Sequence, residues 1–173
     1  YSKEDRVEAE NLFKKNNTQK LNFELTDLLN TYQFARIINH YQGFNLILNA
    51  SKTYNWELNL SEIARIWTHG CIIKSDLMVD LVEIFKKRNS ILKNENIIEQ
   101  LKHLKPSAKK VVSQCVLNDL SIPCLSESVI FFNGYTTANS SANLIQAQRD
   151  YFGAHSYQRI DDISKKFYHT NWN

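Results

Sequence analysis

The sequence predicts an all-α fold, a multi-helix domain with a long central helix and an extended C-terminal tail. The chain contains four glycines and two prolines among 173 residues, so it has few of the turn residues that hairpins need. Apolar residues recur at intervals of three and four from Phe23 to Leu48, a spacing typical of a long helix. This periodicity stops after Gly153. We therefore expect a helical domain over residues 1–153 and an extended tail over residues 154–173.

The segment from Phe23 to Leu48 is the predicted central helix. Phe34, Ile37 and Tyr41 lie off its main apolar stripe, so the helix is apolar on more than one face. A helix of this kind is usually buried on several sides. The main stripe itself consists of Leu25, Leu28, Leu29, Tyr32, Ala35, Ile38, Phe44, Ile47 and Leu48.

Capping signals place the next two helices. Asn59 and Glu62 have the spacing of a capping box, in which the first side chain accepts from the N3 amide and the second reaches back. Gly70 can adopt the left-handed conformation that ends such a helix. Ser75 is the predicted N-cap of a following helix that runs through Phe85.

The second half of the chain is also predicted to be helical. We expect a helix over residues 94–104 and a separate helix that starts at Pro106, because the first turn does not need the missing N–H. Two more helices are expected over residues 126–135 and 143–152, the last ended by Gly153. The predicted buried face of the helix after Pro106 consists of Val111, Val112, Cys115 and Val116.

Composition and charge exclude several classes of protein. Hydrophobic residues make up 43% of the chain and charged residues 23%, which is ordinary for a soluble globular protein. No run of apolar residues is long enough to span a membrane. The charged start, Tyr1 to Asp5, is not a secretory signal, and the only methionine is Met78, so we expect a fragment of a longer polypeptide. A net charge of +3 is too small to indicate a nucleic-acid partner.

The cysteines indicate no cofactor or cross-link. Cys71, Cys115 and Cys124 are odd in number and widely spaced, which fits neither a disulfide framework nor a zinc motif. Reduced thiols in a cytoplasmic protein are the simplest interpretation. A metal site that pairs a cysteine with His155 or His169 has no spacing to support it, so we expect no metal.

No sequence motif of a known catalytic or phosphate-binding type identifies a reaction. The sequence has no G-x-G-x-x-G and no P-loop, and its four glycines are too scattered to form a phosphate-binding loop. The tail carries aromatic residues that we expect to be buried against a surface, either its own or a partner's. These residues are Tyr157, Phe167, Tyr168 and Trp172.

One segment carries a specific resemblance. Residues 142–155 read A-N-L-I-Q-A-Q-R-D-Y-F-G-A-H, which closely resembles the signature near the C-terminus of 6-phosphogluconate dehydrogenases. Other blocks resemble the family in order and spacing, so the resemblance covers essentially the whole chain. They include A-R-I-I followed by Q-G-F at residues 35–44, Y-N-W-x-L-N-L at 54–60, E-I-A-R-I-W at 62–67 and H-T-x-W at 169–172.

The resemblance implies an activity for the full enzyme. Members are homodimers that oxidise and decarboxylate 6-phosphogluconate, giving ribulose 5-phosphate, CO2 and usually NADPH, a step of the pentose phosphate pathway. In the family an N-terminal Rossmann domain binds NADP, the large helical domain forms the dimer core, and the tail passes into the other subunit. The family's catalytic lysine and glutamate lie upstream, so we expect no catalytic residue in this chain and no turnover by the fragment alone.

The resemblance assigns two substrate-binding residues here. Arg149 matches the arginine that binds the 6-phosphate in the partner subunit's active site, and His155 matches the histidine at the same end. A guanidinium offers a planar fork to phosphate oxygens, and imidazole adds a donor. Each residue also has a simpler interpretation, namely a surface arginine paired with a carboxylate and an ordinary tail histidine.

Some positions depart from the family pattern, and other functions stay open. Lys74, Ser141 and Asn171 replace a common arginine, a frequent proline and an acidic residue, and Asn171 puts a charged role of the tail end in doubt. A stand-alone helical self-association module derived from the enzyme is the main alternative. Other β-hydroxyacid dehydrogenases are disfavoured, because they have shorter helical domains without the tail signature.

Overall fold

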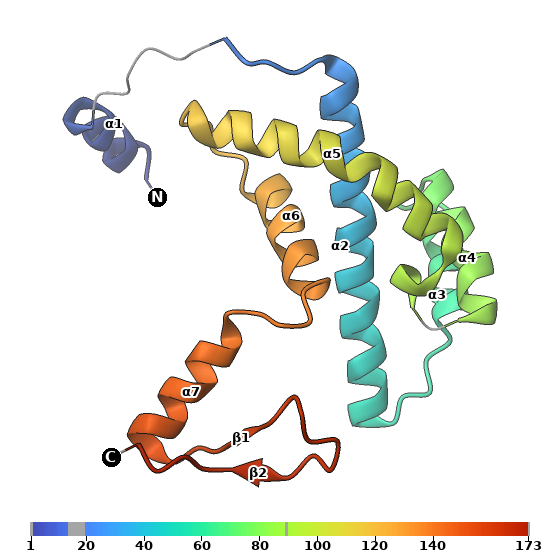
Figure 1. The fold of residues 1–173 in the computed structure, drawn as a ribbon. Coiled ribbons are helices and arrows are strands. Elements are labelled where there is room, and N and C mark those ends of the chain that lie inside the picture. The colour runs from blue at the N-terminus through green and yellow to red at the C-terminus, as the bar shows by residue number, and fades with distance from the viewer. Residues whose placement is uncertain (1, 14–19, 89, 173) are drawn as a thin grey trace. The chain divides into compact units, whose positions relative to one another are not determined.

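The computed structural model describes residues 2–13, 20–88 and 90–172, and it consists of two compact units. The first unit covers residues 1–131 and the second covers residues 132–173. The described residues form seven α-helices, one short 3₁₀ helix and two strands of two residues each (Figure 1). The all-α prediction is therefore confirmed. No helix among the described residues has the length and apolar character needed to cross a bilayer.

Helix α1 (Lys3–Leu12) was not predicted from the sequence. Ser2 and Asp5 form a complete capping box at its start, with the Ser2 hydroxyl accepting from the Asp5 amide at 3.0 Å. None of its residues is buried. Local capping therefore defines this helix, and apolar periodicity gave no signal for it.

Helix α2 (Leu25–Tyr54) is the predicted long central helix, and its thirty residues confirm it. Its buried apolar residues are Phe34, Ile37, Ile38, Tyr41 and Phe44. The apolar side chains of the first two turns are exposed, although they belong to the predicted main stripe. They are Leu25, Leu28, Leu29 and Tyr32.

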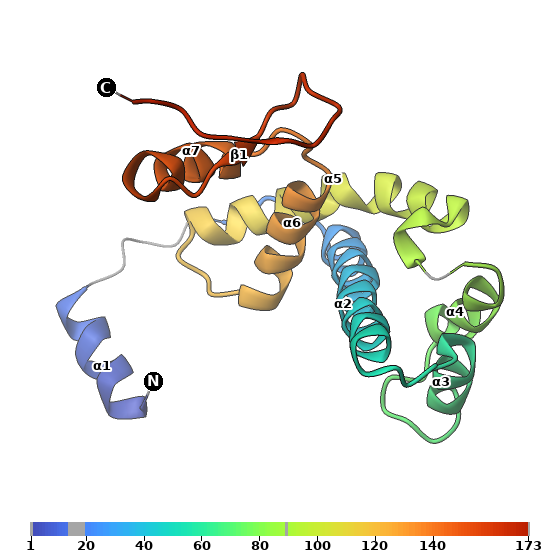
Figure 2. The same cartoon turned by 90° about the horizontal axis from the view of Figure 1, so that it is seen from below.

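Helices α3 (Leu60–Trp67) and α4 (Asp76–Lys87) lie side by side (Figure 2). The Ser61 hydroxyl donates to the Val82 carbonyl at 2.9 Å and joins the two helices. Ser75 caps α4 through the Met78 amide, as predicted. The capping box of α3 is only half formed: Asn59 accepts from the Glu62 amide.

The second half of that capping box is absent because Glu62 has another partner. Its carboxylate accepts from Arg65 Nε at 2.8 Å, so a cation three residues ahead on the same face draws it away from the helix start. Gly70 does adopt the left-handed conformation, with φ at +68°. It lies three residues beyond Trp67, the last residue of α3.

Helix α5 (Glu95–Leu117) corrects the prediction of two helices, because it runs through Pro106 without a break. An apolar stripe continues on both sides of the proline at intervals of four and three residues, and it packs against α2. Burial of this stripe offsets the missing backbone hydrogen bond. The buried residues are Ile97, Leu101, Leu104, Ala108, Val111 and Cys115. Val112 is only half-buried and Val116 is exposed, so that part of the predicted face was wrong.

Polar contacts also join α2 to α5. Asp27 near the start of α2 accepts from the Ser107 hydroxyl at 2.9 Å and pairs with Lys110 at 2.7 Å. The Ser107 hydroxyl in turn accepts from the Asn30 amide at 3.2 Å. The hydrogen bond from Lys110, with those from the Glu24 N–H and from Ser107, lowers the pKa of Asp27 to about 2.

The core of the first unit is aromatic where α2, α3 and α4 meet. The ring of Phe44 lies 4.6 Å from that of Phe85 and 5.2 Å from that of Trp67, measured between centroids. Met78 and Leu81, both on α4, are fully buried in this core. The 3₁₀ helix Ile91–Lys93 follows α4, with Ile91 buried.

Helix α6 (Pro123–Tyr135) begins three residues before the predicted start. Pro123 occupies the first turn, where its missing N–H is not needed, and the Ile122 carbonyl accepts from the Ser126 amide at 3.0 Å. The helix begins in the first unit and ends in the second.

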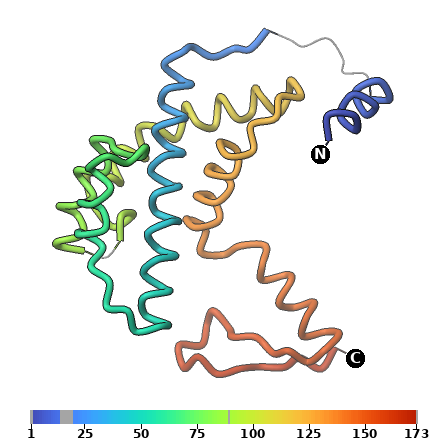
Figure 3. Tube along the Cα trace, turned by 180° about the vertical axis from the view of Figure 1, so that it is seen from behind, coloured from blue at the N-terminus to red at the C-terminus, as the bar shows by residue number. Residues whose placement is uncertain are grey.

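The second unit contains α7 (Ala142–Gly153) and the tail. Strands β1 (Tyr157–Gln158) and β2 (Phe167–Tyr168) pair antiparallel, with Tyr157 opposite Tyr168. The tail is therefore a small hairpin that returns to the end of α7 (Figure 3), which the sequence pattern did not predict.

Candidate functional site

The carboxylate of Asp150 organises the second unit. Asp150 lies in the last turn of α7 and is fully buried. It accepts hydrogen bonds from four donors: the Ser156 amide at 2.8 Å, His169 Nδ1 at 2.9 Å, the Thr170 amide at 3.0 Å and the Trp172 indole at 2.9 Å. Three of these donors come from the last residues of the tail.

Two opposing effects act on the ionisation of Asp150. Burial raises the pKa of its carboxyl, since a charge is costly away from water. The four hydrogen bonds favour the ionised form, outweigh burial and hold the pKa well below its usual range. Asp150 is therefore a carboxylate at neutral pH, and this charge is what orders the donors around it.

The backbone after α7 makes a tight turn. Ala154 and Ser156 both have left-handed conformations, with φ of +50° and +57°. Such values are uncommon for residues other than glycine and cost free energy unless nearby contacts hold them. The Ala154 amide donates to the Asp150 carbonyl at 2.9 Å and the Ser156 amide to the Asp150 side chain. Asp150 thus fixes both residues that flank His155.

Arg149 projects from the last turn of α7 and is exposed. A terminal guanidinium nitrogen donates to Gln146 Oε1 at 3.3 Å. Among the described residues Arg149 has no ion pair, so the alternative of a surface arginine held by a carboxylate is not what the structure has there. Its charge is available to an anion.

His155 follows two residues beyond Gly153 and is also exposed. Its ring meets the Phe152 ring edge-on, with centroids 6.0 Å apart. It also lies so close to Gly153 that a Cβ at that position would stand 2.8 Å from His155 Nε2 and 2.9 Å from Cδ2. The absence of a side chain at Gly153 therefore permits this ring position.

The hairpin has its own polar framework. The guanidinium of Arg159 makes two hydrogen bonds to Asp161 and lies over the Tyr168 ring at 5.6 Å from its centroid. Asp162 accepts from the Ser164 amide at 2.8 Å and from the Tyr168 hydroxyl. The hydrogen bond from Tyr168 is the main cause that lowers the pKa of Asp162.

The second unit buries almost none of its apolar side chains. Of residues 132–172, Asp150 is the only one in the buried class. At the hairpin, Ile163 is 98% exposed and Ile160 77% exposed. Beside α7, residues from the helix and from the hairpin line a hollow of about 450 Å³, including Gln146, Tyr157 and Trp172. Further exposed apolar residues are Leu144, Ile145, Tyr151, Phe152 and Phe167.

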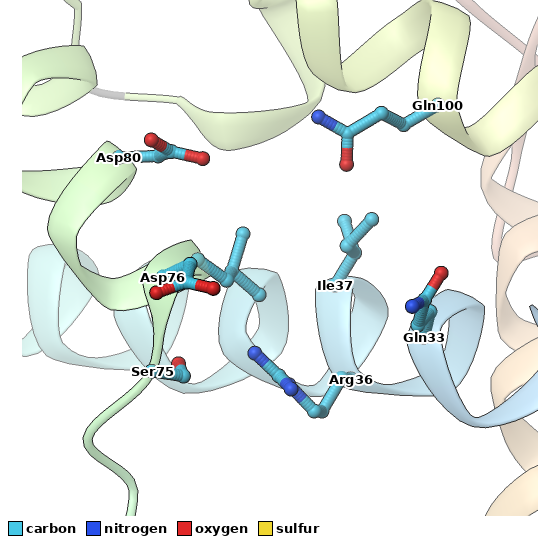
Figure 4. A pocket seen from close by; sticks show the side chains of 8 residues that line it. Gln33, Arg36, Ile37, Ser75, Asp76, Asp80 and Gln100 are labelled. Atoms are coloured by element: carbon cyan, nitrogen blue, oxygen red, sulfur yellow. The ribbon is translucent and has the colours of Figure 1, made fainter. Parts of the chain in front are cut away.

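A polar hollow of about 360 Å³ in the first unit is a second candidate (Figure 4). Arg36 of α2, Asp76 and Asp80 of α4 and Gln100 of α5 surround it. The Ser75 hydroxyl at its rim is engaged in capping α4. No hydrogen bond joins a nucleophile to a base here among the described residues, so this hollow supports no particular chemistry.

No group of three or more metal-ligating side chains occurs in the described part of the chain. The sequence prediction for the site named Arg149 and His155, and the structure places both at the C-terminal end of α7, exposed. The sequence missed the central role of Asp150 and the contact of His169 with it. The aromatic residues of the tail, Trp172 among them, were the sequence signal that the tail lies against a surface.

Comparisons with known proteins agree with this architecture. Residues 1–172 match the family model described as 6-phosphogluconate dehydrogenase, C-terminal domain. The chain belongs to this family. The decarboxylating 6-phosphogluconate dehydrogenase of Treponema pallidum is 39% identical over 144 residues, which are 80% of this chain and 29% of the relative. That of Chlamydia pneumoniae is 39% identical over 151 residues, or 86% of this chain and 32% of the relative.

A solved 6-phosphogluconate dehydrogenase has the same fold as this C-terminal domain. The Plasmodium falciparum enzyme, determined in its apo form and with its cofactor NADP+ and its substrate 6-phosphogluconate, superposes with a TM-score of 0.90 at 38% identity. The match covers 98% of this chain and 38% of that enzyme. This 6-phosphogluconate dehydrogenase domain thus spans about a third of the proteins it resembles.

Proposed function

We propose that this domain provides the dimer contacts and the substrate-phosphate contacts of an NADP-dependent 6-phosphogluconate dehydrogenase. The enzyme would oxidise and decarboxylate 6-phosphogluconate to ribulose 5-phosphate and CO2. The relatives named for this activity and the solved enzyme with NADP+ and 6-phosphogluconate support the reaction. NADP and the proton-transferring residues would be held by parts of the protein outside this chain, so the chain alone is expected to be inactive.

The observation that carries the phosphate role is the exposed Arg149 guanidinium, whose partner is a neutral amide. A phosphate dianion would supply the negative partner that this guanidinium lacks. His155, at the same helix end, adds a donor. The two side chains therefore match the charge and donor needs of one phosphate group.

A second copy of this chain is the proposed occupant of the exposed apolar surface of the tail unit. Among the described residues of this unit only a carboxylate is buried, while Ile160, Ile163 and Phe167 are exposed at the hairpin. Exposed apolar side chains that form a contiguous patch mark protein interaction sites. In such a homodimer Arg149 and His155 would serve the partner's active site.

Steady-state kinetics of the full-length enzyme test the phosphate role. We expect Arg149→Ala to raise the KM for 6-phosphogluconate about 10- to 100-fold, the effect of losing one or two charge-assisted hydrogen bonds. Arg149→Lys should recover only part, since an ammonium group cannot make the planar fork. Arg65→Ala is a matched control, because Arg65 is exposed and paired with Glu62. An unchanged KM for Arg149→Ala would refute the phosphate role.

A further inference from the structure

The side-chain amide of Gln146 connects the two parts of the candidate site. Its Nε2 donates to the Ser156 carbonyl at 2.5 Å, and its Oε1 accepts from Arg149 at 3.3 Å. Ser156 directly follows His155 in the chain. One half-buried, neutral side chain thus contacts both the guanidinium and the backbone next to the imidazole.

We propose that Gln146 is a positioning residue for the Arg149 and His155 pair, an inference that rests on the proposed phosphate role. An amide can donate and accept at once, which these two contacts require. A glutamate here could not donate to the Ser156 carbonyl when ionised, and a lysine could not accept from Arg149. Only a neutral partner holds the guanidinium without cancelling the charge that would attract phosphate.

The backbone at Ser156 shows why a second anchor is needed. Ser156 has a φ of +57°, a conformation that costs free energy for a residue with a side chain. Asp150 holds its amide and Gln146 holds its carbonyl, so the residue is fixed from both sides. Loss of the Gln146 contact would free one side of this residue, and His155 beside it would lose part of its fixed direction.

Two variants separate positioning from a merely structural role. Gln146→Met keeps the length and helix preference of the side chain and removes both hydrogen bonds. We expect it to raise the KM for 6-phosphogluconate about three- to tenfold, the usual effect of a neutral hydrogen bond. Gln146→Glu should raise it more, about 10- to 50-fold, because its carboxylate would pair with Arg149 and compete with the phosphate.

The readout is the separation of KM from kcat in the full-length enzyme. Both variants should change kcat less than about twofold, as expected for loss of binding alone. The inhibition constant of inorganic phosphate should rise in the same order as KM. Gln148→Glu is the control, since Gln148 is exposed on the same helix and contacts no described residue through a side-chain hydrogen bond. Its KM should stay within about twofold of the unchanged enzyme.

The outcomes distinguish this inference from the function on which it rests. Equal KM values for Gln146→Met and Gln146→Glu, with a lowered thermal midpoint in both, would indicate a structural role and overturn the inference. Unchanged KM values for both, in an enzyme where Arg149→Ala raises KM, would also overturn it and leave the phosphate role intact. An unchanged KM in Arg149→Ala would overturn both. A larger KM for Glu than for Met supports the inference.

Discussion

The indole N–H of Trp172 donates to the carboxylate of Asp150 at 2.9 Å and fastens the end of the tail to α7. Asp150 directly follows Arg149 in that helix. The order of the tail and the order of the candidate phosphate site therefore depend on the same buried carboxylate.

Asp150→Asn should release the tail. One carboxylate oxygen becomes an NH2 group that faces N–H donors, so the Ser156, Thr170 and Trp172 hydrogen bonds cannot all form. Amide hydrogen exchange should show loss of protection at Ser156 and Thr170, by about tenfold or more.

The control for this change is Asp80→Asn, which alters an exposed carboxylate in the first unit. It should leave exchange in the tail unchanged. Retained protection at both tail amides in Asp150→Asn would show that the hydrogen bonds to Asp150 do not order the tail.

Gly153→Ala should disturb His155 without destabilising the helix. The new Cβ would stand 2.8 Å from His155 Nε2, so the ring must move, while alanine is the better helix former. In the full-length enzyme we expect the KM for 6-phosphogluconate to rise about three- to tenfold, because donor geometry matters within tenths of an ångström. Gly134→Ala is the matched control, since a Cβ there meets nothing within 4 Å. Equal KM values for the two variants would argue against a role of His155.

Asp27 should make the free energy of unfolding of the first unit decrease as the pH becomes acidic. Its pKa is lowered to about 2 in the folded chain, below the value of roughly 4 for an unfolded aspartate. Its contribution is therefore present above about pH 4 and is lost as the pH falls to about 2. Urea unfolding of the chain and of Asp27→Asn should differ near neutral pH and converge in acid. A difference that is constant with pH would contradict this assignment.

Pro106→Ala should stabilise the chain. Pro106 is exposed inside α5, where it removes one backbone hydrogen bond. We expect the free energy of unfolding to rise by about 1–3 kcal/mol, the usual cost of proline in a helix interior. Thermal unfolding followed by circular dichroism would measure the change. A lower midpoint would mean that a proline at this position is needed for packing against α2.

The sequence predicted those features that depend on neighbouring residues. Most of α2 follows from the apolar spacing of residues 23–48, although the helix continues to Tyr54. Ser75 caps α4 because serine can accept from an amide three residues ahead. The end of α7 was also predicted within one residue. Arg149 and His155 were named by the family resemblance of residues 142–155, and their phosphate role stays a prediction.

Features that depend on distant residues were missed. The four donors to Asp150 come from Ser156, His169, Thr170 and Trp172, and no periodicity connects them to α7. Pro106 misled the prediction because the local rule for proline was given more weight than the stripe that continues across it. That stripe, from Ile97 to Cys115, was visible in the sequence and would have predicted one helix.

Light scattering on a sizing column tests most directly the claim that a second copy covers the apolar surface of the tail unit. We expect a mass of twice 20.2 kDa for this chain. Ile163→Asp, which places a charge on the most exposed apolar residue of the hairpin, should shift the mass toward the single-chain value. A mass of 20.2 kDa for the unaltered chain at every concentration would contradict the claim.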